Sequence, residues 1–291
     1  MRVLLLGGTG HVGAALAPLL AAAYELAAPS RGELDLASAG VRRRAESYRP
    51  DLVVNAAAWT DVDSAERDPA GAFAVNAGAV GELATACASV GAPLIHLSTD
   101  FVFSGELERW YREDDEVGPL NAYGRSKLAG EDAIARAGAV ALVLRTSWVF
   151  GLDRPCFVSR VAARAKTDVE LIAPDDQIGT PTSATELAGA IARIVGVVAP
   201  DPIGYARRFA GIYHLAGPEH ASRYALSRAV LDGVRGRAGY RAERVRAVSA
   251  ADLPTFAPRP LRTPLDSTKA ARAFGIVLSP WRQALARLFA H

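Results

Sequence analysis

Four short segments of the chain are apolar throughout, and this pattern constrains the fold more than any other feature of the sequence. They are VLLL at 3–6, DLVVNA at 51–56, PLIHLS at 93–98 and VALVLRTSW at 140–148. Alanine-rich stretches of helical character separate them. A strand that is apolar on both faces needs helices on both faces, as in the parallel sheets of α/β proteins. The sequence therefore predicts an α/β fold with a doubly wound parallel sheet.

Composition limits what such a chain binds. Its 291 residues, 50% of them hydrophobic, suffice for one large domain with a smaller lobe. The formal net charge is +2 and the charges are scattered, so we expect neither a nucleic-acid partner nor a membrane partner. The apolar run within MRVLLLGGTG is too short for a signal peptide or a membrane span. We expect a cytoplasmic protein, with a homodimer as a possible assembly.

Three glycines at the first strand-to-helix junction predict a dinucleotide-binding turn. Gly7, Gly10 and Gly13 lie in LLLGGTGHVGAAL, after an expected strand and before an expected helix. Glycine permits the tight turn and lets backbone amides approach a pyrophosphate, while the helix N-terminus stabilises negative charge. The motif is short, so a merely structural turn is the alternative. Together with the apolar strands it favours a Rossmann-type sheet.

The residues after the second expected strand bear on the choice between NAD and NADP. An acidic residue about 20 positions after the turn normally holds the ribose hydroxyls of NAD. Here AAPSRGELDL places Ser30 and Arg31 in that position. A hydroxyl beside a guanidinium suits a 2′-phosphate, so we expect NADPH to be preferred, with NADH also usable. An ordinary surface arginine is the alternative reading of Arg31.

The sequence pattern also suggests a division into two parts. After Gly151 the pattern loosens into proline-containing loops, and GIYHLAG at 211–217 resembles another buried strand. Helical segments are expected near 157–166, 184–198, 222–235 and 280–290. We expect a dinucleotide-binding domain over 1–150, to which 184–216 returns. A smaller C-terminal substrate-binding lobe is expected over 151–291, mainly 151–183 and 217–291.

Tyr123 and Lys127 are four residues apart in NAYGRSKLAGE, and Lys127 is one of only three lysines in the chain. On a helix, residues at this spacing share one face. A nearby ammonium favours the phenolate, so we expect the pKa of Tyr123 to be lowered toward the working range, making it a usable general acid. Thr99, in HLSTDFVF at the end of the third long strand, would donate a hydrogen bond to the same substrate oxygen. A solvent-exposed pair on an ordinary helix is the alternative.

The order of glycine turn, STD and Y-x-x-x-K resembles the extended short-chain dehydrogenases/reductases. Finer motifs resemble the dTDP-4-dehydrorhamnose reductase family across nearly the whole chain. They are VNAAAWTDVDSAE at 54–66, STDFVFSG at 98–105, NAYGRSKLAGE at 121–131, LRTSWVFG at 144–151, DDQIGTPT at 175–182 and APRPLRTPLDSTK at 257–269. The resemblance implies NAD(P)H-dependent reduction of the C4 ketone of a dTDP-linked 6-deoxy-4-keto sugar, as in the last step toward dTDP-L-rhamnose.

The resemblance also assigns roles to individual positions. It implies catalysis by Thr99, Tyr123 and Lys127, with the last two also contacting the cofactor. Its cofactor positions correspond to the glycine turn with His11 and Val12, to Asp35 and Leu36 at the adenine, and to Ala56, Ala57, Ala58 and Thr60 beside the cofactor. Its sugar contacts correspond to Asp100 and Trp148, in addition to Thr99 and Tyr123.

Several of these assignments have structural alternatives. Trp148 could be core packing at the domain junction, although an aromatic ring beside a sugar is physically reasonable. Arg259 could bind the nucleotide diphosphate through paired hydrogen bonds, or lie at the surface. Asp176 and Gln177 are expected to tie the lobe together by hydrogen bonds. His11 is expected to contribute its backbone more than its imidazole.

The chain also departs from the family pattern. Relatives commonly show asparagine before phenylalanine after the W-x-x-G segment, whereas this chain has Cys156 and Phe157 after a short LDRP loop. The departure leaves open a reductase or epimerase for another nucleotide sugar. A non-catalytic dinucleotide-binding subunit is a further alternative, which the intact catalytic positions oppose. Metal-ligand spacing is absent from the sequence, and we expect no catalytic metal.

Overall fold

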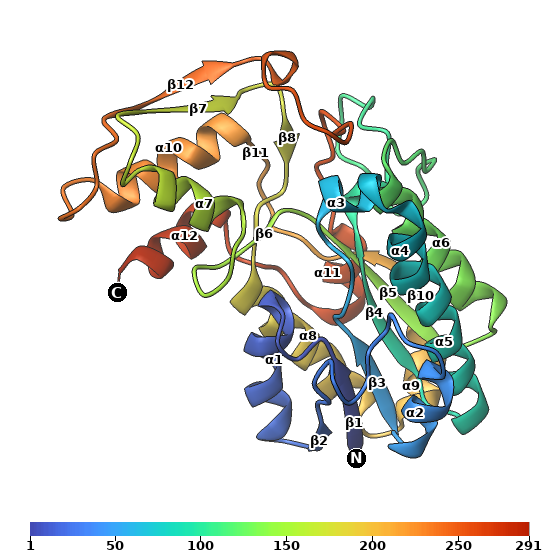
Figure 1. Cartoon of the computed structure of the whole chain (residues 1–291). Helices are drawn as coiled ribbons and strands as arrows, with labels where there is room; N and C mark the ends of the chain where they lie inside the picture. The colour runs from blue at the N-terminus through green and yellow to red at the C-terminus, as the bar shows by residue number, and fades with distance from the viewer. Residues whose placement is uncertain (291) are drawn as a thin grey trace.

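A six-stranded, wholly parallel sheet forms the centre of the molecule, described for residues 1–290 by a computed structural model (Figure 1). Its strands are β1 (Arg2–Leu6), β2 (Glu25–Ala27), β3 (Leu52–Asn55), β4 (Leu94–Thr99), β5 (Ala141–Thr146) and β10 (Gly211–His214). They run in the order β10-β5-β4-β3-β1-β2. The expected doubly wound α/β fold is confirmed, and each of the four apolar runs forms one strand. The strand order reverses between β1 and β3, where open α/β sheets bind ligands at their carboxyl ends.

Helices cover both faces of the sheet, as the apolar strands require. One face carries α1 (His11–Ala21) and α8 (Ala184–Val198), which pack against each other. The other carries α2 (Val41–Ser47), α5 (Ala79–Val90) and α6 (Ala122–Arg136), with α5 in contact with both neighbours. The edge strand β10 is flanked by α9 (Pro202–Phe209), which contacts β5 and α8, and by α11 (Thr268–Phe274).

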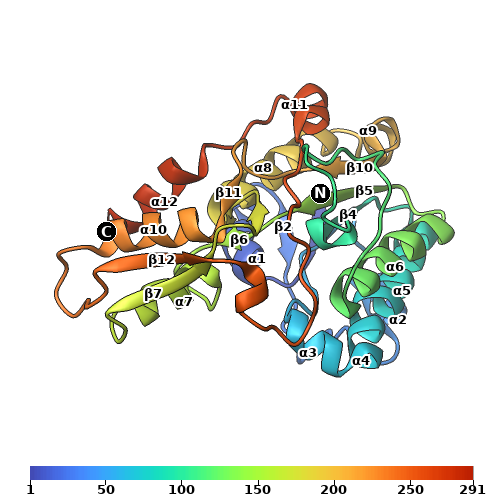
Figure 2. The same cartoon turned by 90° about the horizontal axis from the view of Figure 1, so that it is seen from above.

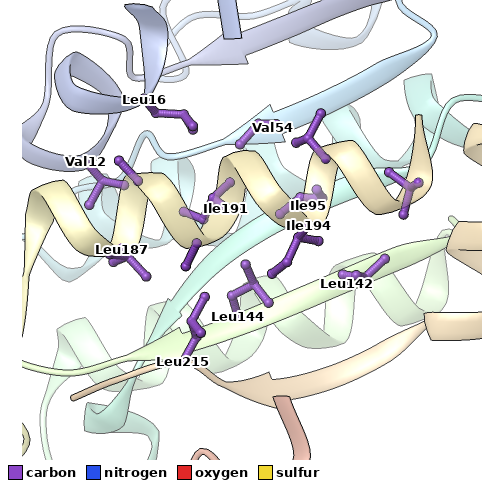
Figure 3. Close-up of a cluster of buried hydrophobic side chains, with 14 of the residues drawn as sticks. Val12, Leu16, Val54, Ile95, Leu142, Leu144, Leu187, Ile191, Ile194 and Leu215 are labelled. Atoms are coloured by element: carbon purple, nitrogen blue, oxygen red, sulfur yellow. The ribbon is translucent and has the colours of Figure 1, made fainter. Parts of the chain in front are cut away.

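The core on the α1 and α8 side contains residues that lie far apart in the sequence. Figure 3 shows Leu187, Ile191 and Ile194 of α8 between helix α1 and the strands. Leu16 of α1 and Leu144 of β5 join the same cluster, and all five side chains are fully buried. Helix α8 therefore packs with the sheet domain, although in the chain it follows the first part of the lobe.

The opposite core is built on a long apolar helical stretch. From Pro69 to Val90 the chain runs through α4 (Pro69–Phe73), a π-helical turn η1 (Ala74–Gly78) and α5. By length and composition this stretch could span a membrane, but α5 packs between α2 and α6 against the sheet. A core helix of an α/β domain accounts for the apolar character equally well. The short helix α3 (Val62–Arg67) precedes it.

The smaller lobe, which stands beside the sheet in Figures 1 and 2, has its own hydrophobic core. Strands β7 (Glu170–Pro174) and β12 (Arg244–Val248) pair in parallel, and α10 (Arg223–Val234) packs on both. Helices α7 (Phe157–Arg164) and α12 (Trp281–Phe289) pack against α10. All four helical segments expected in the second half of the sequence are present within a few residues of their expected bounds.

Short paired segments connect sheet and lobe. They are β6 (Val149–Phe150) with β9 (Thr182–Ser183), and β8 (Ile178–Gly179) with β11 (Ala221–Ser222). Two 3-10 turns complete the elements, η2 (Asp100–Val102) and η3 (Ala250–Asp252). We propose the domain division expected from the sequence, with α8, α9 and β10 assigned to the dinucleotide-binding part. Residue 291, the last of the expected lobe, lies outside the described residues.

Candidate active site

The glycine turn lies against the end of β3, so tightly that side chains are excluded. Gly7 has φ +78°, and a Cβ there would lie 2.6 Å from the Ala56 carbonyl carbon and the Ala57 nitrogen. A Cβ at Gly13 would overlap the Gly7 carbonyl, while the Gly10 amide donates to that oxygen at 2.9 Å. The turn and the Ala56–Ala57 segment thus form one backbone surface at the carboxyl edge of the sheet. Such a surface fits close approach by a dinucleotide pyrophosphate.

The flanking positions expected to contact the cofactor surround this surface. Val12 is buried in the first turn of α1, and Ala58 and Thr60 continue the loop after β3. The His11 ring lies toward the lobe, with Nε2 3.4 Å from the Pro155 carbonyl oxygen. Its backbone stays at the N-terminus of α1.

Ser30 and Arg31 lie beyond the end of β2, on a loop that approaches the glycine turn. A Cβ at Gly8 would be 3.5 Å from the Cβ of Ala28, which precedes this loop. The Ser30 hydroxyl donates to Glu33, and the Arg31 Nε donates to Asp35 at 3.3 Å. The Arg31 side chain remains 81% exposed, and its only partner among residues 1–290 is Asp35, bonded through Nε.

Beside this pair, the two expected adenine positions differ in exposure. The Asp35 carboxylate is partly buried and accepts the amide of Ala37, which lowers its pKa. The Leu36 side chain is buried within the α2 and α5 core. Leu36 therefore packs the core behind the loop, and Asp35 is the more accessible of the two.

Helix α6 brings Tyr123 to the carboxyl end of β4. The Asn121 side chain caps the helix by accepting the Gly124 amide at 2.8 Å. A Cβ at Gly124 would overlap the Phe101 carbonyl oxygen, so glycine lets this turn of α6 pack directly onto η2. The Tyr123 ring meets Phe101 edge-on at 5.7 Å, and its hydroxyl lies near enough to Thr99 for that side chain to lower the pKa of the phenol. The structure thus brings together two of the three expected catalytic residues.

The expected acidification of Tyr123 is wrong. The pKa of Tyr123 is raised to about 12, chiefly by burial; the Thr99 side chain opposes the increase in part, and the Asp100 carboxylate makes the smallest contribution to it. The ammonium of Lys127 is not among the causes. A neighbouring ammonium alone would lower the pKa of the phenol, but removing the phenolate from water costs more than that charge returns.

Lys127 is buried one turn after Tyr123 and bonds to strand β4. Its Nζ lies 2.7 Å from the Leu97 carbonyl oxygen and 3.2 Å from His96 Nε2. Burial lowers the pKa of Lys127 to about 8, and Glu131 acts in the opposite direction. The exposed-pair alternative is therefore excluded, because the Lys127 side chain is not exposed. His96 carried no signal in the sequence analysis, since an isolated histidine in an apolar run resembles ordinary core.

Asp100, an expected sugar contact, is directed into the protein. Its carboxylate accepts from the hydroxyls of Thr263 at 2.6 Å, Ser147 at 2.9 Å and Thr99 at 3.2 Å. Burial raises its pKa, against these three hydrogen bonds. Asp100 therefore joins the ends of β4 and β5 to the C-terminal loop and orients the Thr99 hydroxyl.

Trp148 lies at the junction of sheet and lobe in a strained conformation. Its φ is +44°, a region that non-glycine residues rarely occupy, and strained residues of this kind concentrate at functional sites. The Arg223 guanidinium stacks over its ring at 3.5 Å and over the Phe157 ring at 4.4 Å. A Cβ at Gly179 would overlap the indole, so glycine makes room for it. Half-buried Trp148 combines junction packing with partial exposure.

Three arginines concentrate positive charge near this junction. Arg259 pairs with Asp63 at 2.9 Å, and its buried Nη1 has no hydrogen-bond partner within the described residues. The pKa of Arg223 is lowered to about 9, chiefly by burial; the Asp100 carboxylate opposes this shift, and the charges of Arg160 and Arg259 add to it. Sequence reasoning selected only Arg259, because nothing local distinguishes Arg160 or Arg223 among so many arginines. Such a cluster suits a phosphate or diphosphate.

Asp176 serves the lobe as expected. Its carboxylate accepts from the Ser249 hydroxyl and the Ala250 amide and so holds turn η3. The Gln177 carbonyl accepts the Arg223 amide at the start of α10. Within residues 1–290, no cluster of three or more His, Cys, Asp and Glu side chains is arranged to hold a metal ion.

Comparison with known proteins places this arrangement in a family. A family model described as the RmlD substrate binding domain matches residues 1–291. The chain belongs to the RmlD family. A dTDP-4-dehydrorhamnose reductase from Sinorhizobium fredii is 39% identical, over 99% of this chain and 96% of that protein.

Solved structures give the same result for the RmlD fold. A dTDP-4-dehydrorhamnose reductase from Clostridium acetobutylicum has a TM-score of 0.88 at 29% identity, covering 100% of this chain and 99% of the other. A reductase of the same name from Bacillus anthracis, in complex with NADP, has a TM-score of 0.87 at 27% identity, covering 99% and 98%.

The structure explains how this RmlD chain accommodates its unusual Cys156. Cys156 is the N-cap of α7, and its Sγ accepts the Ser159 amide at 3.5 Å while Ser159 bonds back to the Cys156 amide. Asparagine is a favoured residue for this capping position. The thiol therefore replaces a stronger acceptor in the same role, next to Phe157 and its contact with Arg223.

Proposed function

We propose that this chain reduces the C4 ketone of a dTDP-6-deoxy-4-keto-hexose with NAD(P)H, converting dTDP-4-dehydro-L-rhamnose to dTDP-L-rhamnose. The RmlD family membership and the reductase names of the relatives support this function. The observation that carries it is the Thr99–Tyr123 hydroxyl pair at the carboxyl edge of the sheet, with Lys127 one helical turn away. The chain is an NAD(P)-dependent oxidoreductase.

The residues present fit the dinucleotide. Gly7 and Gly13 leave no room for a Cβ, so the backbone of the turn and the adjoining Ala56–Ala57 segment are open to a pyrophosphate. Ser30 and Arg31 would hold a 2′-phosphate, and Asp35 would lie near the adenosine end. When bound, NADPH or NADH supplies the hydride that reduces the carbonyl carbon.

Tyr123 would protonate the substrate oxygen. Because burial raises its pKa to about 12, the phenol is protonated throughout the physiological range and is ready to donate. When substrate binds, the Thr99 hydroxyl would turn its single proton from Asp100 to the same oxygen. The Lys127 ammonium, one helical turn away, would stabilise the phenolate that remains after proton transfer. The charge of Lys127 would thus act on the Tyr123 phenolate once the proton has been transferred to the substrate.

The nucleotide sugar would lie between this pair and the lobe. Arg259, with its unpartnered buried Nη1, would bind the diphosphate, supported by Arg160 and Arg223. Trp148 offers its ring to the sugar face, and Asp100 acts by holding Thr99. We also propose a cytoplasmic location, because the enzyme consumes NADPH and a nucleotide sugar.

Purified protein tests the substrate directly. With NADPH and dTDP-4-dehydrorhamnose, loss of NADPH absorbance should accompany formation of dTDP-L-rhamnose. The same assay with other nucleotide-linked 4-keto sugars addresses the alternative raised by Cys156 and Phe157, which alter the rim of the lobe. Faster reduction of another sugar would identify that sugar as the preferred substrate. NADPH binding without any turnover would favour a non-catalytic subunit.

A further inference from the structure

A chain of three buried side chains runs from β3 through β4 to α6. Asn55 Nδ2 lies 3.1 Å from His96 Nδ1, and His96 Nε2 lies 3.2 Å from Lys127 Nζ. Asn55 and His96 are fully buried, and Lys127 is 2% exposed. Their polar groups therefore have to form hydrogen bonds with compatible donors and acceptors, because buried polar groups without partners are costly.

The orientation of the Asn55 amide is fixed by its other contact. Asn55 Oδ1 accepts the Ala57 amide at 3.1 Å, so the atom that faces His96 is Nδ2. An amide NH₂ group only donates hydrogen bonds. His96 Nδ1 must therefore be the acceptor and carry no proton. In a neutral imidazole the proton is then on Nε2, which faces Lys127.

This tautomer restricts the proton state of Lys127. An ammonium group has three donors and no lone pair, so it cannot accept the Nε2–H bond. A neutral amine accepts it and still donates to the Leu97 carbonyl oxygen. We propose that His96 is a positioning residue that Asn55 holds in its Nε2–H form, and that it stabilises the neutral amine of Lys127 in the unliganded enzyme.

The surrounding charges agree with this assignment. Burial lowers the pKa of both His96 and Lys127, and the charge of Lys127 acts on His96 in the same direction. Glu131, one turn further along α6, favours the ammonium, but Arg145 of β5 and the Ser98 hydroxyl of β4 occupy its carboxylate. Tyr123, the other titratable group on this face of α6, stays neutral.

The consequence is a lysine that exchanges its proton near neutral pH. Protonation of Lys127 makes the contact with Nε2–H repulsive and frees Nζ from the ring, while loss of the proton restores the contact. The inference rests on the proposed function only for its effect on turnover. His96 would limit the pH range in which Lys127 is the ammonium that stabilises the Tyr123 phenolate.

Nuclear magnetic resonance of the unliganded protein tests the proposal without substrate. Lysine labelled with ¹³C at the ε-carbon gives three signals, from Lys127, Lys166 and Lys269, of which Lys127→Met identifies the first. In His96→Gln the amide oxygen turns toward the ammonium, so the Lys127 midpoint should rise by about 0.5 to 1 unit, the worth of one hydrogen bond. The exposed His220→Gln is the matched control and should leave the midpoint unchanged.

Two further measurements keep the test decisive. In the unmodified protein, the ¹⁵N chemical shifts of His96 should show a proton on Nε2 and none on Nδ1. This measurement does not depend on whether any variant folds. In turnover, His96→Gln should move the alkaline limb of kcat/KM upward while retaining activity at lower pH. A His96 proton on Nδ1, or an unchanged or lowered Lys127 midpoint in His96→Gln, would overturn the proposal. Absence of turnover with an intact Lys127 shift would instead count against the proposed function.

Discussion

At the residue scale, burial shifts the pKa values of Tyr123 and Lys127 in opposite directions, and in both residues it favours the neutral form. It raises the pKa of the phenol to about 12 and lowers that of the amine to about 8. In each case the charged form is disfavoured because it is removed from water. The pair enters catalysis with a firmly protonated donor and a lysine that responds to pH.

This pair predicts a simple pH profile. The kcat/KM value should fall as the pH rises through about 8, where Lys127 loses its positive charge, because the phenolate of Tyr123 then lacks its stabilising neighbour. Tyr123 remains protonated over the same interval. The measurement is kcat/KM between pH 6 and pH 10, with Lys127→Met as the control that removes the step. A flat profile up to pH 10 would contradict the role given to Lys127.

The choice of cofactor is a second residue-scale prediction. Arg31→Ala should weaken NADPH binding by about 10-fold or more and leave NADH binding nearly unchanged, because a charge-assisted pair with phosphate is worth roughly 1.5–3 kcal/mol. Dissociation constants from cofactor fluorescence measure both. Arg136→Ala, exposed at the end of α6, is the control. Equal losses for the two cofactors would remove the 2′-phosphate argument.

Sequence reasoning at this scale succeeded where spacing determines geometry. The four-residue interval placed Tyr123 and Lys127 on one helical face, and STD placed Thr99 at the strand end. It failed on the pKa of Tyr123, because desolvation depends on η2 and β4 packing around the ring. It also missed His96 and Arg223, whose partners come from distant elements.

At the element scale, the position of α6 depends on close backbone packing. Gly124→Ala should destabilise the protein by about 1–3 kcal/mol and reduce turnover, because the added methyl overlaps the Phe101 carbonyl and displaces Tyr123. Gly189→Ala, in α8 with open space around it, is the matched control and should be neutral or stabilising by up to about 1 kcal/mol. Thermal unfolding and kcat measure the two effects. Equal stability and turnover in both variants would refute the packing argument.

The elements themselves were predictable to different degrees. Strands β3, β4 and β5 followed from apolar runs, and α8 from an uninterrupted helical pattern. The parallel pair β7 and β12 was not foreseen, because β7 alternates buried and half-buried positions over only five residues and its partner lies far along the chain. No local pattern encodes that pairing.

At the scale of the whole molecule, the chain leaves the sheet for the lobe and then returns. Besides two alanines, five branched α8 side chains lie in the core on the α1 side: Leu187, Ile191, Ile194, Val195 and Val198. Burying each is worth about 1.5–3 kcal/mol, so together they contribute on the order of 10 kcal/mol, comparable with the net stability of a typical domain. Without α8, the first 150 residues alone would therefore leave the α1 face of the sheet partly uncovered.

A fragment of residues 1–150 should therefore not fold cooperatively. Without α8 and β10, the α1 face of the sheet and the β5 edge have no cover. Calorimetry should show no sharp unfolding transition, whereas the full chain should show one. A cooperative transition in the fragment would mean that the dinucleotide-binding part is complete without the returning segment.

The central claim is that the half-buried, neutral phenol of Tyr123 donates the proton to the substrate oxygen. Tyr123→Phe removes only the hydroxyl group. The matched control is Tyr205→Phe, which removes the hydroxyl of an exposed tyrosine on α9, outside the active site. Single-turnover reduction of dTDP-4-dehydrorhamnose, measured together with NADPH binding, separates chemistry from cofactor affinity. We expect Tyr123→Phe to bind NADPH normally and to lose at least about 10²-fold in rate, with Tyr205→Phe unaffected. Reduction by Tyr123→Phe at nearly the parent rate would contradict the account.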